Sequence, residues 1–276
     1  MGHHDHYHHY GHHYRPSGSS EPTLLGLVLR LFDRPTWGVY DNLPSFDPSA
    51  EAEQFVLAAR VEKLRGVHRE PIRTIPWQAH ASTIDPGGDG HADWEEVHTL
   101  ATRVLAGDLL AYREALAACE SLVAVRSHVG ADGVQVALSE RHAHVDLRAP
   151  LGEAVPTGAG TLVRTMRQRL DVYQDYVCGI ALRTARELLG ALPLDEVTVD
   201  LWNVSAAPEA GETSSAYREG EKPAVNVRIA SMRCARDEMN AIRWEGSDAS
   251  NVVTRLAHAM RFDPEQGFYA VDHIGR

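Results

Sequence analysis

The longest continuous helical pattern in the chain covers residues 156–190, and it limits the fold more than any other segment. Apolar residues recur there at spacings of three, four or their sums, which predicts one apolar stripe along an α-helix. The stripe consists of Leu162, Met166, Leu170, Tyr173, Val177, Ile180 and Leu188. Gly190 and Pro193 predict the end of this helix. A second layer of structure has to cover such a stripe.

Segments rich in β-forming residues supply that layer. The segment 122–140 has two such runs around Gly-Ala-Asp-Gly, which predicts a β-hairpin. Further strands are predicted at 24–32, 142–149, 196–204, 224–232 and 267–274. Shorter helices are predicted at 50–66, from about residue 93, from 108, at 236–242 and at 248–260, with irregular segments at 70–92 and 207–222. The expected fold class is α+β: antiparallel strands with helices packed on one face and a long central helix near 160–190.

The composition divides the chain into three parts. Residues 1–22 hold seven histidines and cannot form a core, so we expect a disordered tail able to bind Ni²⁺, Zn²⁺ or Cu²⁺. An expression tag, an inert natural tail and a metal buffer are all consistent with this segment. Residues 23–107 are expected to form an N-terminal α/β segment, and residues 108–276 a C-terminal α+β domain.

Charge and cysteine content narrow the class of protein. The 276 residues carry a net charge of −11, which repels nucleic acid and argues against a non-specific DNA coat protein. Lys63 and Lys222 are the only lysines in an Arg-, Ala- and Val-rich chain, which is typical of a high-GC bacterium. The three cysteines lie far apart and predict neither a disulfide framework nor a structural zinc site, so a cytoplasmic home fits best. No apolar run approaches about 18 residues, so no membrane span is expected.

The sequence "HAHVD" is the strongest candidate for a metal site. It places His142, His144 and Asp146 on one side of a predicted strand, because side chains alternate along a strand. Imidazole and carboxylate groups bind divalent metals such as Zn²⁺ or Ni²⁺. His91 and His98, with Asp93, from "HADWEEVH" are candidates to complete the ligand set. The alternative is a solvated strand face that binds no cofactor.

Other chemical motifs are weak or missing from the sequence. The glycine-rich "PTGAGT" at 156–161 lacks the lysine of a P-loop and fits an ordinary helix start. No GxSxG elbow and no HExxH zinc motif occurs. The lysine of a PD-(D/E)xK nuclease motif cannot be placed, because the residues two before the only lysines are Val61 and Gly220. No catalytic residue is therefore assigned.

One resemblance to a known family covers roughly residues 109–274. "YQDYVCGIALRTARELL", then "EVTVDLWNV", a loop and "AVNVRIASMRCARDEMNAI" resemble a region of bacterial restriction-endonuclease proteins of the Mrr type. In those proteins the nuclease domain, with its catalytic residues, follows this region, whereas this sequence stops at Arg276. The resemblance therefore implies a non-catalytic accessory module.

Three hypotheses about function follow. The first is a non-enzymatic cytoplasmic interaction module, for which the acidic charge favours a protein partner. The second is a metal-dependent hydrolase built around His142, His144 and Asp146. The third is nucleic-acid binding by one face of the long helix, although interspersed acidic residues dilute its positive charge. The arginines concerned are Arg164, Arg167, Arg169, Arg183 and Arg186. The partner and the oligomeric state stay open.

Overall fold

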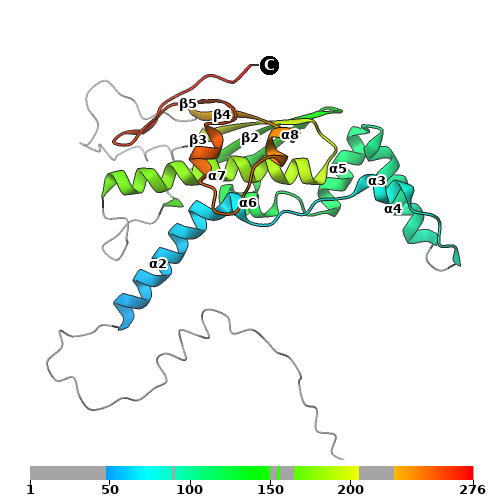
Figure 1. Ribbon diagram of the computed structural model, residues 1–276, viewed down its shortest axis with the longest axis horizontal. Coiled ribbons are helices and arrows are strands. Elements are labelled where there is room, and N and C mark those ends of the chain that lie inside the picture. The colour runs from blue at the N-terminus through cyan, green and yellow to red at the C-terminus, as the bar shows by residue number, and fades with distance from the viewer. Residues whose placement is uncertain (1–47, 89–90, 150–153, 156–164, 205–226, 276) are drawn as a thin grey trace, which may run out of the picture. The chain divides into compact units, whose positions relative to one another are not determined.

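The computed structural model describes residues 48–88, 91–149, 154–155, 165–204 and 227–275 (Figure 1). A five-stranded sheet packs against one long helix, α7, and the strand order in the sheet is β1-β2-β3-β4-β5. Neighbouring strands are antiparallel except β2 and β3, which are parallel. The α+β class with a central helix is therefore confirmed. The predictions for residues 1–22, 24–32 and 207–222 lie outside the described residues.

The elements have the following bounds. The strands are β1 (Val134–Leu138), β2 (His142–Ala149), β3 (Glu196–Asn203), β4 (Val227–Ala235), β5 (Ala257–Met260), β6 (Phe262–Asp263) and β7 (Gly267–Phe268). The helices are α2 (Pro48–Gly66), α3 (Trp77–Ser82), α4 (His91–Leu105), α5 (Leu109–Ala118), α6 (Val123–Val129), α7 (Met166–Ala191), α8 (Arg236–Asn240) and α9 (Ala249–Val253), with short 3₁₀ turns η1 (Val67–Arg69) and η3 (Ala131–Gly133).

Helix α7 is buried on all its sides along its second half. Residues 176–185 are all buried, because the sheet covers one side of the helix while α2, η1 and α9 cover the other. The helix starts at Met166, where Thr165 and Gln168 form a reciprocal capping box. The sequence predicted that the helix continues from residue 156 through Thr165, but Thr165 is the cap and is not helical. Residues 156–164 lie outside the described part of the chain.

The two faces of the sheet differ in polarity. Along β2, the buried residues are Ala143, Val145, Leu147 and Ala149, and they alternate with polar side chains. Strand β3 shows the same alternation from Val197 to Leu201, except that Asp200 is also buried. The apolar face packs on α7, and the polar face points the other way.

The hairpin expected at 122–140 is wrong in its first half. Residues 123–129 form helix α6, and only β1 is a strand. Strand β1 pairs with β2, and in the tight turn between them Ser139 N donates to His142 O. Tertiary contacts override the β-propensity of the valines. Val125 and Val129 are buried four residues apart, and the Leu122 backbone N–H donates to the Glu187 carboxylate of α7 at 2.7 Å.

Three other sequence predictions are corrected. The helix expected at 248–260 ends at Val253, because residues 257–260 pair with β4 as strand β5. The strand expected at 267–274 is a strand only at Gly267–Phe268. The irregular segment 70–92 contains helix α3, which the Trp77 indole anchors by donating to Ala191 O at 2.7 Å.

One hydrophobic core connects the described helices and the sheet. Val61, Trp77 and Val104 belong to the same cluster of buried residues as α7 and the strands. Residues on the two sides of position 107 thus share one core, and the division into 23–107 and 108–276 stays a prediction. Among the described residues, no helix is long and apolar enough to cross a lipid bilayer.

Gly179 tests how tightly α7 is enclosed. A Cβ atom at this position would lie 2.8 Å from Val67 Cγ1, and the valine is fully buried. We therefore expect Gly179→Ala to lower the free energy of unfolding by about 1–3 kcal/mol, measured by urea denaturation. Gly66→Ala is the control, because nothing lies within 4 Å of its added Cβ. Equal stabilities of the two variants would contradict the close packing.

Asp175 on α7 predicts a pH dependence of stability. Burial and the nearby Asp248 carboxylate raise the pKa of Asp175 to about 6. The folded state thus binds a proton that the unfolded state, with a pKa of 3.8, has already lost. That stabilisation disappears as the pH rises through 6. The free energy of unfolding of Asp175→Asn, relative to that of the natural chain, should therefore increase by about 1–3 kcal/mol as the pH is raised from 4.5 to 8. Parallel urea-unfolding profiles over this range would refute the raised pKa.

Candidate functional site

The polar face of the sheet carries the candidate site. Strand pairing sets its side chains in rows, because residues in register on neighbouring strands lie side by side. One row holds Asp146, Asp200 and Ser231, and the next row holds His144, Thr198 and Arg233. A carboxylate in the middle strand is thereby surrounded by imidazole, hydroxyl and guanidinium groups.

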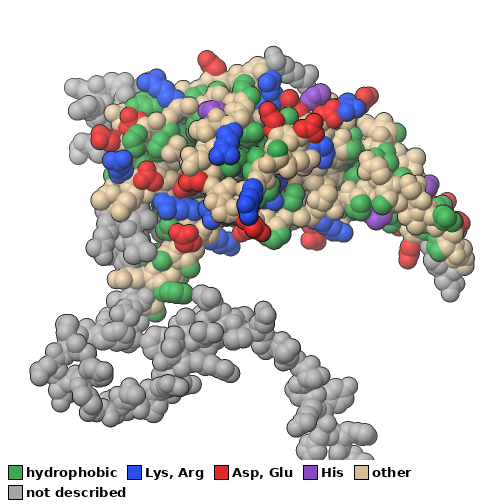
Figure 2. Space-filling model, viewed as in Figure 1, with side chains coloured by type: hydrophobic (Ala, Val, Ile, Leu, Met, Phe, Trp, Pro, Cys, Tyr) green, Lys and Arg blue, Asp and Glu red, His purple; other side chains and the backbone are tan. Residues whose placement is uncertain are grey.

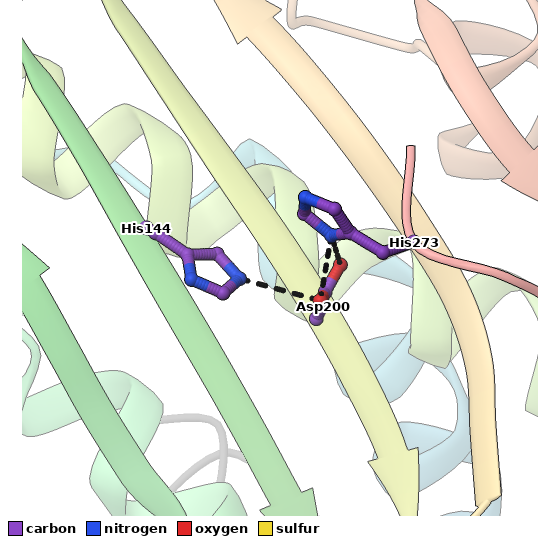
Figure 3. Close-up of side chains that lie close together, drawn as sticks. All are labelled: His144, Asp200 and His273. Carbon is purple, nitrogen blue, oxygen red and sulfur yellow. Dashed lines mark hydrogen bonds and ion pairs between the residues drawn. The ribbon is translucent and has the colours of Figure 1, made fainter. Parts of the chain in front are cut away.

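Asp200 is the centre of this face, with only 1% of its side chain exposed. Its Oδ2 atom lies 3.2 Å from Nε2 of His144 and 3.0 Å from Nδ1 of His273 (Figure 3). Arg228 Nε lies 3.0 Å from the same oxygen. One buried carboxylate thus holds two imidazoles and one guanidinium, and the two imidazole rings meet edge to face with centroids 5.3 Å apart.

His273 reaches Asp200 from outside the five-stranded sheet. After β7 the chain crosses the face opposite α7 (Figure 1). Two hydrogen bonds from backbone N–H groups fix this segment to β4: Val271 N donates to the carbonyl oxygen of Arg228 at 2.9 Å, and Ile274 N donates to the side-chain Oγ of Ser231 at 3.0 Å. These bonds position His273 over β3, beside His144 on β2.

A cleft of ≈ 290 Å³ opens beside the two histidines. Strands β1 to β4 form its floor, and the segment that carries His273 forms one wall. Its lining residues are Ala137, Leu138, Ser139, His142, Ala143, His144, Glu196, Thr198, Arg233, His273, Ile274 and Gly275. Both histidine side chains are 42% exposed, so they offer ring atoms to the cleft while Asp200 lies beneath them.

Arg228 supports Asp200 from the side away from the cleft. Its guanidinium stacks on the Trp202 ring, 4.5 Å from the ring centroid, and the Trp202 indole donates to Asp146 Oδ1 at 2.7 Å. The Nε–H of Arg228 is buried and does not point at Asp200 Oδ2, so this contact is an ion pair without a hydrogen bond. The arginine therefore balances the charge of Asp200 and leaves the carboxylate lone pairs to the imidazoles.

The structure does not bring the predicted metal ligands together: those on β2 lie on the sheet, and those on α4 lie on that helix. His144 belongs to the cluster, and His142 lines the cleft next to it. Asp146 instead accepts the hydrogen bond from Trp202. His91 and His98 lie on α4, where both stack on Trp94 and where His91 Nδ1 pairs with Asp85 Oδ2 at 2.9 Å.

Two members of the cluster were missed by the sequence interpretation. Asp200 carried only a weak signal: it is an acidic residue within the strand "VTVDLW", but it falls in the polar phase of the alternation together with Thr198. Burial of a carboxylate in a strand is costly unless the group is paired, so such a residue is a candidate for a site. His273 carried no local signal, because its segment is not a strand.

The cluster consists of residue types that could hold a metal ion. Among the described residues, His144, Asp200 and His273 are the group whose ligand atoms converge, all within 4.8 Å of one another. The separations of 3.2 and 3.0 Å between the imidazole nitrogens and Asp200 Oδ2 are near the edge of about 3.3 Å of a tetrahedron around a zinc ion with ligand bonds of about 2.0–2.1 Å. An ion would replace the protons that the imidazoles donate to Asp200.

The arginines proposed for nucleic-acid binding are partly engaged in packing. Arg183 is buried and pairs with Glu187, and the guanidiniums of Arg183 and Arg186 both donate to Glu70 O. Arg186 also stacks on Trp244, 4.3 Å from the ring centroid. In the view of Figure 2, basic and acidic side chains are interspersed on the surface rather than gathered by sign. These observations do not favour a basic nucleic-acid interface on α7.

Comparison with protein-family models, with curated proteins and with solved structures found no match. The resemblance to the region that precedes the nuclease domain of Mrr-type proteins therefore stays a prediction.

Asp200→Asn tests the role of the buried charge. The substitution leaves Arg228 without its counter-charge, so we expect the free energy of unfolding to fall by about 2–4 kcal/mol in urea denaturation. Asp146→Asn is the matched control, because Asp146 lies in register with Asp200 but accepts a hydrogen bond from a neutral indole. A loss below about 0.5 kcal/mol for Asp200→Asn would show that the charge is not needed by the fold.

Proposed function

We propose that this protein is a metal-dependent hydrolase that binds a divalent transition-metal ion through His144, Asp200 and His273. The observation that carries the proposal is the convergence of two imidazoles on one buried carboxylate at the edge of a cleft. This ligand set suits Zn²⁺, Ni²⁺ or Fe²⁺, and three protein ligands leave a coordination position for water or substrate.

The surroundings of the three ligands also suit a catalytic ion. Arg228 contacts Asp200 from behind, as groups outside the ligand set commonly orient ligating carboxylates. Both histidines line the cleft and are 42% exposed, so a substrate in the cleft would lie next to an ion held by the cluster. When bound, such an ion supplies Lewis-acid chemistry: it polarises a substrate oxygen and lowers the pKa of a coordinated water molecule.

The non-enzymatic accessory module is the second candidate function. Apolar side chains exposed on α2, namely Phe55 at 50% and Val56 at 63%, favour a protein partner for that helix. An interface on α2 is compatible with a metal site on the sheet. The two surfaces can therefore coexist, although a non-enzymatic module would not use the metal site for hydrolysis.

Zinc stoichiometry tests the proposed function. The full chain is loaded with zinc, treated with a moderate chelator and measured by mass spectrometry. Because the histidine-rich residues 1–22 are the same in every variant, any zinc that they bind cancels in the difference between variants, which then reports on the cluster. We expect His144→Ala and His273→Ala each to hold one zinc ion fewer than the natural chain, with affinity at the cluster reduced more than about 100-fold.

His142→Ala is the control for that measurement. His142 lines the same cleft and lies on the same strand face, but it is not a member of the cluster. This variant should keep the zinc stoichiometry of the natural chain. Equal zinc content in the natural chain, His144→Ala and His273→Ala would overturn the proposal.

A further inference from the structure

We propose that the cleft beside the cluster binds the phosphoryl group of a small phosphate monoester through Arg233, Thr198 and His142. This inference rests on the proposed hydrolase function and names its substrate class. The three residues come from three adjacent strands and line the same cleft as His144 and His273.

The register of the sheet sets this second group of side chains directly beside the cluster. Thr198 and Arg233 are partners on β3 and β4, and Thr198 lies two residues before Asp200. His142 lies two residues before His144 on β2. Two residues along a strand span about 6.6–6.8 Å, so each of these side chains lies one strand repeat from the cluster on the same face of the sheet.

The donors in this row have few partners of their own. Within the described part of the chain, Arg233 makes one long ion pair, from Nε to Glu196 Oε2 at 3.6 Å, and no side-chain hydrogen bond. The His142 ring and the Thr198 hydroxyl also have no hydrogen-bond partner among the described residues. A guanidinium with unused N–H groups matches the oxygens of a phosphate in bidentate geometry.

The charge balance of the cleft favours an anion. Arg228 offsets Asp200 and Arg233 offsets Glu196, so the charges near the cluster cancel in pairs. A divalent ion adds two positive charges, which a phosphate dianion neutralises. Without this ligand, two positive charges remain uncompensated in a partly enclosed space, where charge interactions are strong.

The cleft volume of ≈ 290 Å³ favours a small molecule over a polymer. Ligand pockets for drug-sized molecules begin at about 300 Å³, so the cleft accommodates a phosphoryl group and a small alcohol portion. In the hydrolysis of such an ester, the oxygen of water bonds to phosphorus and the ester P–O bond breaks. A proton from the water passes to the departing alcohol oxygen, which leaves inorganic phosphate and an alcohol.

The test measures the binding of inorganic phosphate to the full chain by isothermal titration calorimetry, with and without zinc. Arg233→Gln removes the guanidinium, and Arg233→Lys keeps the charge but not the bidentate geometry. We expect Arg233→Gln to weaken phosphate binding by about tenfold or more, and Arg233→Lys by less. Arg255→Gln, an exposed arginine that does not line this cleft, should bind phosphate like the natural chain. Thermal unfolding establishes that each variant is folded.

The outcomes separate this inference from the proposed function. Phosphate affinity that depends on Arg233, together with zinc bound at the cluster, supports the inference. The same phosphate affinity without zinc at the cluster supports a phosphate site but overturns the hydrolase function and with it the substrate class. If zinc binds at the cluster but Arg233→Gln does not change the phosphate affinity, the inference is overturned. The proposed metal site is then still supported. Failure of both zinc and phosphate to bind overturns both.

Discussion

Asp200 is almost completely shielded from water, and the polar face of the sheet depends on the groups that contact its carboxylate. Arg228 supplies the opposite charge, while His144 and His273 supply directed N–H groups. A buried carboxylate without such partners would be protonated or would destabilise the fold. The same carboxylate accepts the imidazole of a segment that hydrogen bonds to β4 hold in place.

The placement of Asp200 in turn follows from α7. This helix is the connection between the parallel strands β2 and β3, and parallel neighbours require such a crossover. By packing on one face of the sheet, α7 buries the apolar residues of both strands and leaves their polar residues on the other face. His144 and Asp200 are 56 residues apart in the chain, and the crossover makes them neighbours.

The parts of the fold that were predicted correctly are those with a strong local pattern. The apolar residues of α7 from Tyr173 to Leu188 and the alternation of β2 and β3 are visible in the sequence itself, whereas Met166 of the predicted stripe is 60% exposed. The hairpin prediction for 122–140 was wrong in its first half because valines favour strands. Contacts of Leu122 and Val125 with other parts of the chain stabilise a helix there instead. His144 was predicted because its neighbours alternate, but pairing it with Asp200 required knowing that β2 and β3 are adjacent and parallel. His273 lies in a segment without periodicity, so no local pattern linked it to the cluster.

The stacking of Arg228 on Trp202 connects the cluster to an aromatic ring. The guanidinium touches the indole on one side and the Asp200 carboxylate on the other. Indole emission responds to the position of a nearby charge, so a change in what Asp200 binds is passed to Trp202 through one intervening side chain. We therefore expect the emission of Trp202, one of five tryptophans in the chain, to change when the contacts of Asp200 change.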